Sequence, residues 1–600
     1  MSHGWFRAGA AFPLVFFHPS VTQKLCRQSS RQSSRQRWGR TVHRPQSTAL
    51  ALLLLAALAP RAEAADRTWD NGESGDWNDT AHWGGNPYPG AGGTAILTLT
   101  SGSYYPVSAV SYTGTVTILP FAGKAWTGNS GTDWATGGNW AGGVPGAADD
   151  VIIDGGVNPP TINLSSAVTI KSLLIGLTTA STLTFQNGDV STKKLIVTGD
   201  AIIGPNGTMT HVANAGTDAH IVNLRIAGNL RIDAGGGIEV SGQGLTAVLN
   251  DGRSGGTHGG QGGAGYDVTY LATPCGSVTN PVTSGSAGLY SGGTGPGGGV
   301  VVLNVTGTAT INGNIYAKGY SFTASNGGGG AGGSINITAN SIAGSGALDA
   351  RGGEGFNNAA GGGGGRIAVV TAGSGFGALT MDTRGGGDGS DARYWGAGGT
   401  IYLKKAGDVR GTLLVDGKNV PQGSNNGLLP RTLIGPSVTD TVVGDVQLLN
   451  LANLQIASTC TLTVYGSWSN AVGPAALTGG GTVEFKGTGT NSVWGGNTWN
   501  NLTIATAGKT VNFEAGKTQT VFGAAAFSNV TLQSTSLNQW HLRKPGIGTQ
   551  YVGRVTVYDS HAGTNTAEYM FWGAVGSEVS DPDNRNWNFT RPEGTVIMMR

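Results

Sequence analysis

The feature that most constrains this chain is a repeat of about 33 residues between positions 298 and 417. Each repeat opens with a Gly-Gly pair, and the four pairs are spaced by 34, 32 and 34 residues. An alternating strand follows each pair, with its apolar positions in one register: Val301 and Leu303, Ile335 and Ile337, Ile367 and Val369, Ile401 and Leu403. Equivalent side chains at a fixed spacing are expected to stack between repeats, with strands about 4.8 Å apart.

A second strand in each repeat keeps the same spacing, and we expect its four copies to stack as well. Its apolar positions are Ile315 and Ala317, Leu348 and Ala350, Met381 and Thr383, Leu413 and Val415. Two strands in register per repeat predict an all-β fold, a parallel β-helix solenoid spanning residues 161–435. The glycine-rich runs at 326–333 and 361–365 are expected to carry no core and to form loops on one side.

Two small repeats precede the solenoid, in residues 65–160. Each has the pattern Trp-x7-Trp-x5-Trp, and the copies lie 57 residues apart: Trp69, Trp77 and Trp83, then Trp126, Trp134 and Trp140. We expect these tryptophans to plug the apolar edge of a short β module, and stacking on sugar rings is the alternative. After residue 435 glycine becomes rarer, which predicts a second β-helix portion over 436–545, then C-terminal strands and a cap over 546–600.

Residues 1–64 are predicted to be a signal peptide with a long basic n-region. An apolar run extends from Ala49 to Ala59, and Ala62 and Ala64 place small residues before a cleavage site near Ala64. Cleavage would remove nine of 36 basic and one of 34 acidic residues, leaving 27 and 33, a net charge of −6. We therefore expect a secreted, extracellular or cell-surface protein that does not bind nucleic acid.

The mature chain offers few residues for a membrane span or a metal site. No run of 18 apolar residues follows Ala65, so no transmembrane span is expected. Its two cysteines, Cys275 and Cys460, lie outside any CxxC spacing and predict no zinc site. Two separate thiols or one long-range disulfide both remain open.

Several motifs resemble catalytic or ligand-binding signatures, but their context is wrong. Gly252-Arg-Ser254-Gly-Gly256 matches the nucleophile elbow, with His258 nearby, yet it opens a glycine run where a helix is required. Asp267 and Asp391 end segments that match the start of the calcium-binding nonapeptide, whose sites require tandem copies. No cofactor is expected, and Ca²⁺ at Asp267 and Asp391 is the alternative.

A charged ladder is the strongest candidate site. Lys318, Arg351 and Arg384 recur at a spacing of 33, and Tyr316, Asp349 and Asp382 stand two residues before them. Both sets are expected to point outward, beside inward Ala317, Ala350 and Thr383. Neighbouring carboxylates and bases on one β-helix face resemble the sites of acidic-polysaccharide lyases. The alternative is that Asp and Arg pair across repeats on a solvated face, which is the expectation we favour.

The combination of Trp modules ending in Pro145-Gly146-Ala147 with runs such as Gly364-Gly-Arg-Ile-Ala-Val resembles secreted bacterial glycine-rich surface proteins of the adhesin or autotransporter-passenger kind. The resemblance implies a right-handed β-helix and a place outside the cell. It implies no catalytic residues. The function expected is that of a structural or adhesive surface protein, not an enzyme, with extracellular glycans or cell-surface components as partners. The alternative is a β-helix that binds or cleaves polysaccharide.

Overall fold

The computed structural model describes residues 123–249, 251–290, 293–323, 326–387, 391–545 and 549–563, with Asn584 and six short strands outside these ranges. Those strands are β1 (Arg67–Trp69), β2 (Thr94–Thr98), β3 (Thr115–Leu119), β48 (Phe571–Trp572), β49 (Glu578–Val579) and β50 (Trp587–Asn588). The predicted signal peptide lies outside the described residues, as does most of the first Trp repeat and of the predicted cap.

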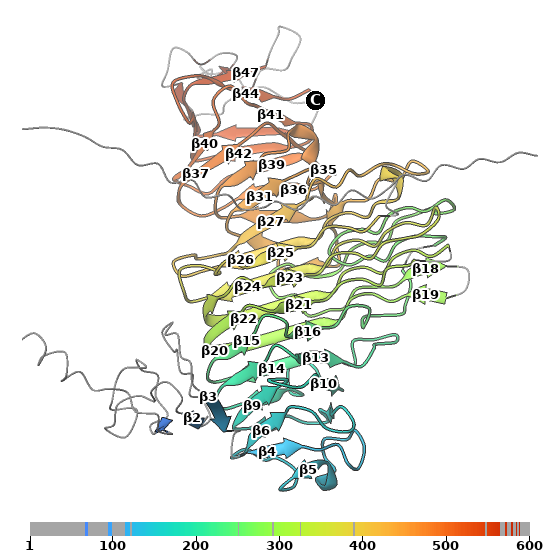
Figure 1. The fold of residues 1–600 in the computed structure, drawn as a ribbon. Helices are drawn as coiled ribbons and strands as arrows, with labels where there is room; N and C mark the ends of the chain where they lie inside the picture. The colour runs from blue at the N-terminus through green and yellow to red at the C-terminus, as the bar shows by residue number, and fades with distance from the viewer. Residues whose placement is uncertain are drawn as a thin grey trace, which may run out of the picture. The chain divides into compact units, whose positions relative to one another are not determined.

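The chain is all-β, as predicted. Nearly all strand pairs in the described residues are parallel, and they build sheets of up to 21 strands (Figure 1). The described residues contain no α-helix, only short 3-10 turns such as η3 (Ala392–Tyr394). None of the helical segments in this part of the chain is long and apolar enough to cross a membrane.

One seven-stranded sheet contains the second strand of the predicted repeat. Its strands are β7 (Thr161–Asn163), β10 (Ser181–Gln186), β13 (Gly207–His211), β16 (Gly237–Glu239), β21 (Asn314–Tyr316), β23 (Ala347–Asp349) and β25 (Thr380–Asp382). Ile315 pairs with Leu348, and Leu348 pairs with Met381. The predicted register is therefore confirmed for three of its four copies.

The first strand of the repeat lies in the 21-stranded sheet. The strands there are β14 (Val222–Ile226), β20 (Val300–Ile311), β22 (Ser334–Ala343), β24 (Arg366–Thr371) and β26 (Thr400–Lys404). Val301, Ile335, Ile367 and Ile401 stack in one register and are buried. Each apolar side chain is thus covered by its equivalents in the neighbouring repeats, which is how this sheet builds its core.

The fourth copy of the second strand departs from the prediction. β27 (Thr412–Asp416), which carries Leu413 and Val415, does not pair with β25 but runs antiparallel to β26, with Tyr402 opposite Leu413. The reason is the short turn over residues 405–411, which brings the chain straight back along the strand it has just left. β27 then pairs in parallel with β31 (Val446–Leu449), so the strand direction in this sheet reverses here.

The glycine-rich runs form loops on one side of the strands, as predicted, but the prediction that they carry no core is wrong because they are buried. Residues 327–333 and 359–365 are buried, and in Figure 1 these segments run side by side beyond the ends of β21 and β23. In residues 328–333, successive backbone N–H groups point in rotation to three neighbouring segments. Gly328 and Ala331 donate to residues 289 and 286, Gly329 and Gly332 to 360 and 363, and Gly330 and Gly333 to 320 and 317. We call this body the glycine layer, comprising residues 255–263, 285–289, 296–299, 317–320, 328–333, 350–355, 360–365, 384–387 and 394–399.

A rotation of three residues per turn is typical of the extended polyproline II conformation, where every third N–H faces the same way. The layer therefore satisfies its buried backbone groups without forming a sheet. Glycine is required because the segments lie backbone against backbone. A Cβ on Gly364 would collide with the carbonyl oxygen of Thr383, and one on Gly332 with that of Ala350.

Beyond β27 the repeat is shorter and the core contains large aromatic side chains. Parallel sheets continue through strands that include β34 (Trp468–Asn470), β36 (Thr482–Phe485), β38 (Asn497–Trp499), β40 (Lys509–Phe513), β41 (Thr518–Val521) and β44 (Trp540–Arg543). Trp468, Trp499 and Trp540 are fully buried. The Trp499 indole N–H donates to Gln519, 3.1 Å away, so its burial leaves no polar group unpaired.

The second Trp repeat forms a plug, as predicted. Trp126, Trp134 and Trp140 are buried, and edge-to-face contacts join Trp140 to Trp126 and to Trp134 at centroid distances of 4.9 and 4.7 Å. They cover the end of the apolar core beside β4 (Lys124–Trp126) and β6 (Asp150–Ile153). Of the first repeat only the strand backbones are described.

Candidate functional site

The charged ladder lies at the ends of β21, β23 and β25. Tyr316, Asp349 and Asp382 occupy one register position across the three strands. Ala317, Ala350 and Thr383, the next residues along the chain, are buried as predicted. The outward placement of the charged residues follows from this alternation, although Asp349 itself is only 8% exposed.

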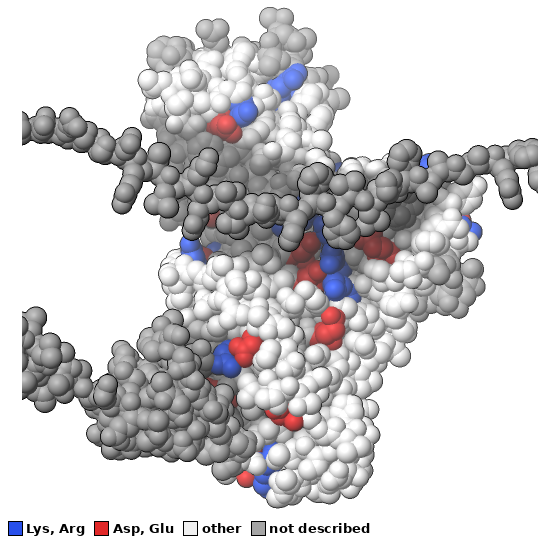
Figure 2. Space-filling view, in the orientation of Figure 1, with Lys and Arg blue, Asp and Glu red and all other residues white. Residues whose placement is uncertain are grey.

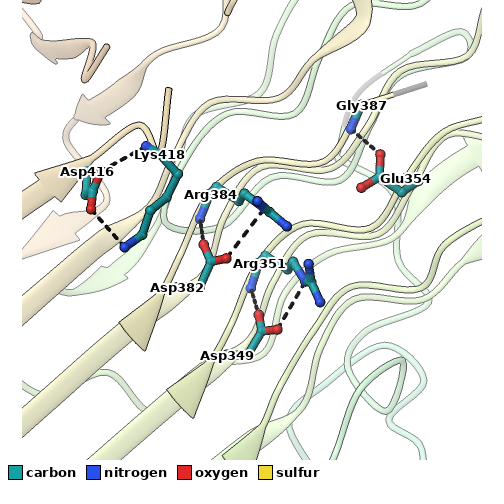
Figure 3. Close-up of polar contacts among 8 residues, drawn as sticks. All are labelled: Asp349, Arg351, Glu354, Asp382, Arg384, Gly387, Asp416 and Lys418. Carbon is teal, nitrogen blue, oxygen red and sulfur yellow. Dashed lines mark hydrogen bonds and ion pairs between the residues drawn. The ribbon is translucent and has the colours of Figure 1, made fainter. Parts of the chain in front are cut away.

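Each acid of the ladder bonds to the base two residues later in its own strand, not to a base in the next repeat (Figure 3). Asp349 accepts the Arg351 backbone N–H at 3.0 Å and pairs with the Arg351 guanidinium at 3.1 Å. Asp382 does the same with Arg384, at 3.0 and 3.5 Å. The predicted pairing across repeats is therefore wrong, because a carboxylate two residues before an N–H closes a local turn at lower entropic cost.

Lys318 holds the same position without an acid two residues before it. Its ammonium group lies over the Tyr316 ring, 4.2 Å from the centroid, so a cation–π contact replaces the ion pair. The three bases of the ladder each have a partner within their own strand end.

Asp416 and Lys418 repeat this chemistry and were missed in the sequence. Asp416 accepts the Lys418 backbone N–H at 2.9 Å and pairs with its ammonium group at 3.0 Å. The signal was available, since both residues follow Asp382 and Arg384 by 34 positions. They lie outside the seven-stranded sheet, at the end of β27 (Figure 3).

The two buried acids differ in their electrostatics. Burial raises the pKa of Asp349, and the neighbouring Asp382 charge raises it further, against the opposing effect of Arg351. Burial also raises the pKa of Asp416, but hydrogen bonds from Asn450 and Lys418 outweigh it, so the net shift is downward. Asn450 donates to Asp416 at 2.9 Å, a contact that Asp349 lacks.

A pocket of about 290 Å³ adjoins the ladder. Its lining residues are Ser241, Lys318, Gly319, Ser321, Arg351, Gly352 and Glu354. Asp349 and Asp382 are not among them, and Glu354 already accepts the backbone N–H of Gly387 at 2.8 Å. The pocket thus presents two bases and one engaged carboxylate, a set that suits binding an anion better than paired-carboxylate chemistry.

Both calcium candidates already accept hydrogen bonds from backbone N–H groups. Asp267 accepts the Arg253 backbone N–H at 2.7 Å. Asp391 caps η3 and pairs with the Arg393 guanidinium at 2.5 Å. In the described part of the chain, no three His, Cys, Asp or Glu side chains gather where a metal ion could bind.

His258 lies inside the glycine layer and Ser254 directly precedes it in the chain, and both are fully buried. His258 bonds to the carbonyl oxygen of Gly332 and to the Thr283 hydroxyl, each at 2.9 Å, and burial lowers its pKa to about 3. Both ring nitrogens therefore bond within the glycine layer and beside it, and neither forms a hydrogen bond with Ser254. Cys275 and Cys460 are both free thiols.

Figure 2 shows that charges are sparse on the described surface of one face: blue and red atoms lie side by side over the region of β23 and β25, and most other described residues are white. A scan of protein-family models finds no match for this chain, and searches of curated proteins and of solved structures find none either.

Proposed function

We propose that residues 161–545 form a right-handed parallel β-helix, and that the protein is a secreted or cell-surface structural or adhesive scaffold without catalytic activity. The observation that carries the proposal is the use made of the ladder acids. Asp349, Asp382 and Asp416 each close a turn at the end of their own strand and are neutralised there. The hydrogen bonds and ion pairs of these carboxylates therefore stabilise the ends of their strands.

The strand pairing supports the β-helix. Successive strands of one repeat belong to different sheets, and each pairs with its equivalent in the next repeat, as β21 and β22 do with β23 and β24. A rigid stack of this kind, with a buried glycine layer beside it, suits a protein that presents a long fixed surface.

The second candidate function is polysaccharide binding or cleavage at the ladder. The pocket bordered by Lys318, Arg351 and Glu354 favours it, because two bases and two serine hydroxyl groups could hold an acidic sugar. Cleavage would also require a carboxylate pair or a free base beside the bound sugar. Glu354, the one acid of the lining, already accepts the Gly387 backbone N–H, and the acids of the adjoining ladder already bond to Arg351 and Arg384.

Incubation of the purified chain with acidic and neutral polysaccharides, with and without Ca²⁺, tests the proposal. The expected result is that neither unsaturated nor new reducing ends appear. A product that forms with the wild type and disappears in Arg351→Gln or Asp382→Asn, but persists in the distant Lys517→Gln control, would overturn the scaffold and make the ladder an active site.

A further inference from the structure

A groove of about 590 Å³ lies on the outer side of the 21-stranded sheet, where β14, β20, β22, β24 and β26 are neighbours. One row of its lining residues shares a register position: Arg225, Asn304, Thr338, Val370 and Lys404. None of the five is fully buried, whereas the residues preceding them face the core. With strands about 4.8 Å apart, the row is roughly 19 Å long.

Short side chains create the space. Thr306, Asn340, Ala372 and Ala406 form a second row two residues further along each strand. The turn over residues 405–408 walls one end, and its shape depends on Gly407, whose φ is 86°. Asp408 stabilises this turn by accepting the Lys405 backbone N–H at 3.0 Å.

The groove holds positive charge that no ion pair among the described residues neutralises. Arg225 lies at one end, and Lys404 and Lys405 lie at the other, with Asp408 as the one acid of the lining. In the described residues none of these three bases forms an ion pair, in contrast to Arg351, Arg384 and Lys418. Amide and hydroxyl groups of Asn304, Thr306, Thr338 and Asn340 lie between the charged ends.

The arrangement fits a long, hydroxyl-rich ligand that carries separated negative charges. A nucleic acid would call for denser cations along its phosphates, and a single strand also for aromatic rings on which bases stack, which the lining lacks. We propose that the groove binds an extended segment of an acidic polysaccharide, with one carboxylate or sulfate group at Arg225 and another at Lys404 and Lys405. This inference rests on the proposed function, because a surface scaffold is what would present the groove to such a glycan.

Binding of the full chain to polygalacturonate, heparin and neutral dextran, measured by calorimetry at low and moderate salt, tests the inference. We expect binding to an acidic polymer, weakened by salt, and none to dextran. The triple variant R225Q/K404Q/K405Q should lose about 10-fold or more in affinity, since it removes all three exposed charge contacts. The control K193Q/K194Q/K517Q removes the same charge outside the groove and should bind as the wild type.

Three results would overturn the groove assignment: no binding to either acidic polymer, equal loss in the two triple variants, or tighter binding to single-stranded DNA than to the glycans. Thermal unfolding of both variants shows whether a loss of affinity reflects a loss of fold. None of these results contradicts the scaffold proposal, which fails only if the protein cleaves a polysaccharide.

Discussion

The strands before and after the β26–β27 hairpin stack in the same parallel way but fill their cores differently. Before it, aliphatic ladders such as Val301, Ile335 and Ile367 are accompanied by the glycine layer. After it, Trp468, Trp499 and Trp540 fill the core, with Asn497 and Gln519 buried among them. The comparison shows that parallel pairing determines the spacing between strands and not what is packed around them. Aliphatic rows beside a layer of glycine backbone fit this spacing, and so do the largest aromatic side chains.

The largest effect is expected where one side chain fills most of a repeat. Trp499→Ala should reduce the free energy of unfolding by about 3–5 kcal/mol, because it leaves a cavity and removes the indole hydrogen bond to Gln519. Urea unfolding followed by fluorescence measures the change. Trp494→Ala, at a neighbouring position that is 44% exposed, is the control and should cost far less. Equal losses in both variants would mean that the aromatic core is not what stabilises this half.

In the other half the reverse change, adding one methyl group, should destabilise. Gly364→Ala is expected to cost about 1–3 kcal/mol or more, since the new Cβ meets a backbone carbonyl that cannot change rotamer. Hydrogen exchange at residues 328–333 and 360–365 should accelerate. Gly375→Ala in the same repeat meets no atom within 4 Å and should leave exchange unchanged. Unchanged protection in Gly364→Ala would show that the layer is looser than its hydrogen bonds indicate.

A substitution at Lys509 shows whether a buried charge lowers the stability of the second half, whose core contains buried aromatic rings. Burial lowers its pKa to about 8, from an ordinary 10.5. The unfolded chain therefore binds more protons between these values, and stability should rise as the pH rises from about 8 to 10.5. Lys509→Met should remove this dependence and stabilise the protein by about 1–3 kcal/mol near pH 7.

The matched control is Lys517→Met, in the next copy of the same Ala-Gly-Lys-Thr sequence, where the lysine is exposed. It should change neither the stability nor its pH dependence. Thermal unfolding between pH 7 and 10.5 makes the comparison, and a stabilisation of equal size in both variants would contradict the burial argument.

The smallest effects on the free energy of unfolding are expected at Asp349 and Asp416, and the effects at these two acids should differ in sign. The pKa of Asp416 is lowered on folding, so its contribution is present above pH 3.8 and is lost as the pH falls through its folded pKa. The pKa of Asp349 is raised, so its ionisation opposes folding above pH 3.8. Asp416→Asn should therefore destabilise at pH 7 by about 1 kcal/mol, and Asp349→Asn should be neutral or slightly stabilising. Unfolding at pH 7 and pH 3 measures both, and equal effects would refute the contrast.

The features that were predicted best from the sequence are those that depend on the alternation of apolar and polar side chains along a strand. Val301, Ile335, Ile367 and Ile401 could be placed in one buried row because alternation and a fixed spacing determine which face a side chain takes. The glycine layer could not be predicted this way. Gly329 and Gly332 have no side chain to show a period, and runs of glycine are also typical of loops, so only the repeated alignment of such runs pointed to packing.

The hairpin and the groove depend on geometry that a spacing argument does not contain. Leu413 and Val415 keep the repeat spacing, but the short turn before them sends β27 back along β26. The charges of the groove come from strands as distant in sequence as Arg225 and Lys404, and they share a face only once the intervening pairs are known. The ladder residues could be found from their spacing in the sequence. Which base each acid pairs with could not, because the pairing depends on the turn at the end of each strand.

The reversal at the hairpin also limits how the chain can misfold. A stack of similar repeats can shift by one whole unit and still bury much the same surface, so such proteins risk a family of slipped states. β26 and β27 exchange contacts with each other in the opposite direction, and Tyr402 bonds through its hydroxyl to the Gly411 backbone N–H inside that hairpin. We therefore expect a register slip in one half to stop at the hairpin, so that each half aligns its strands separately.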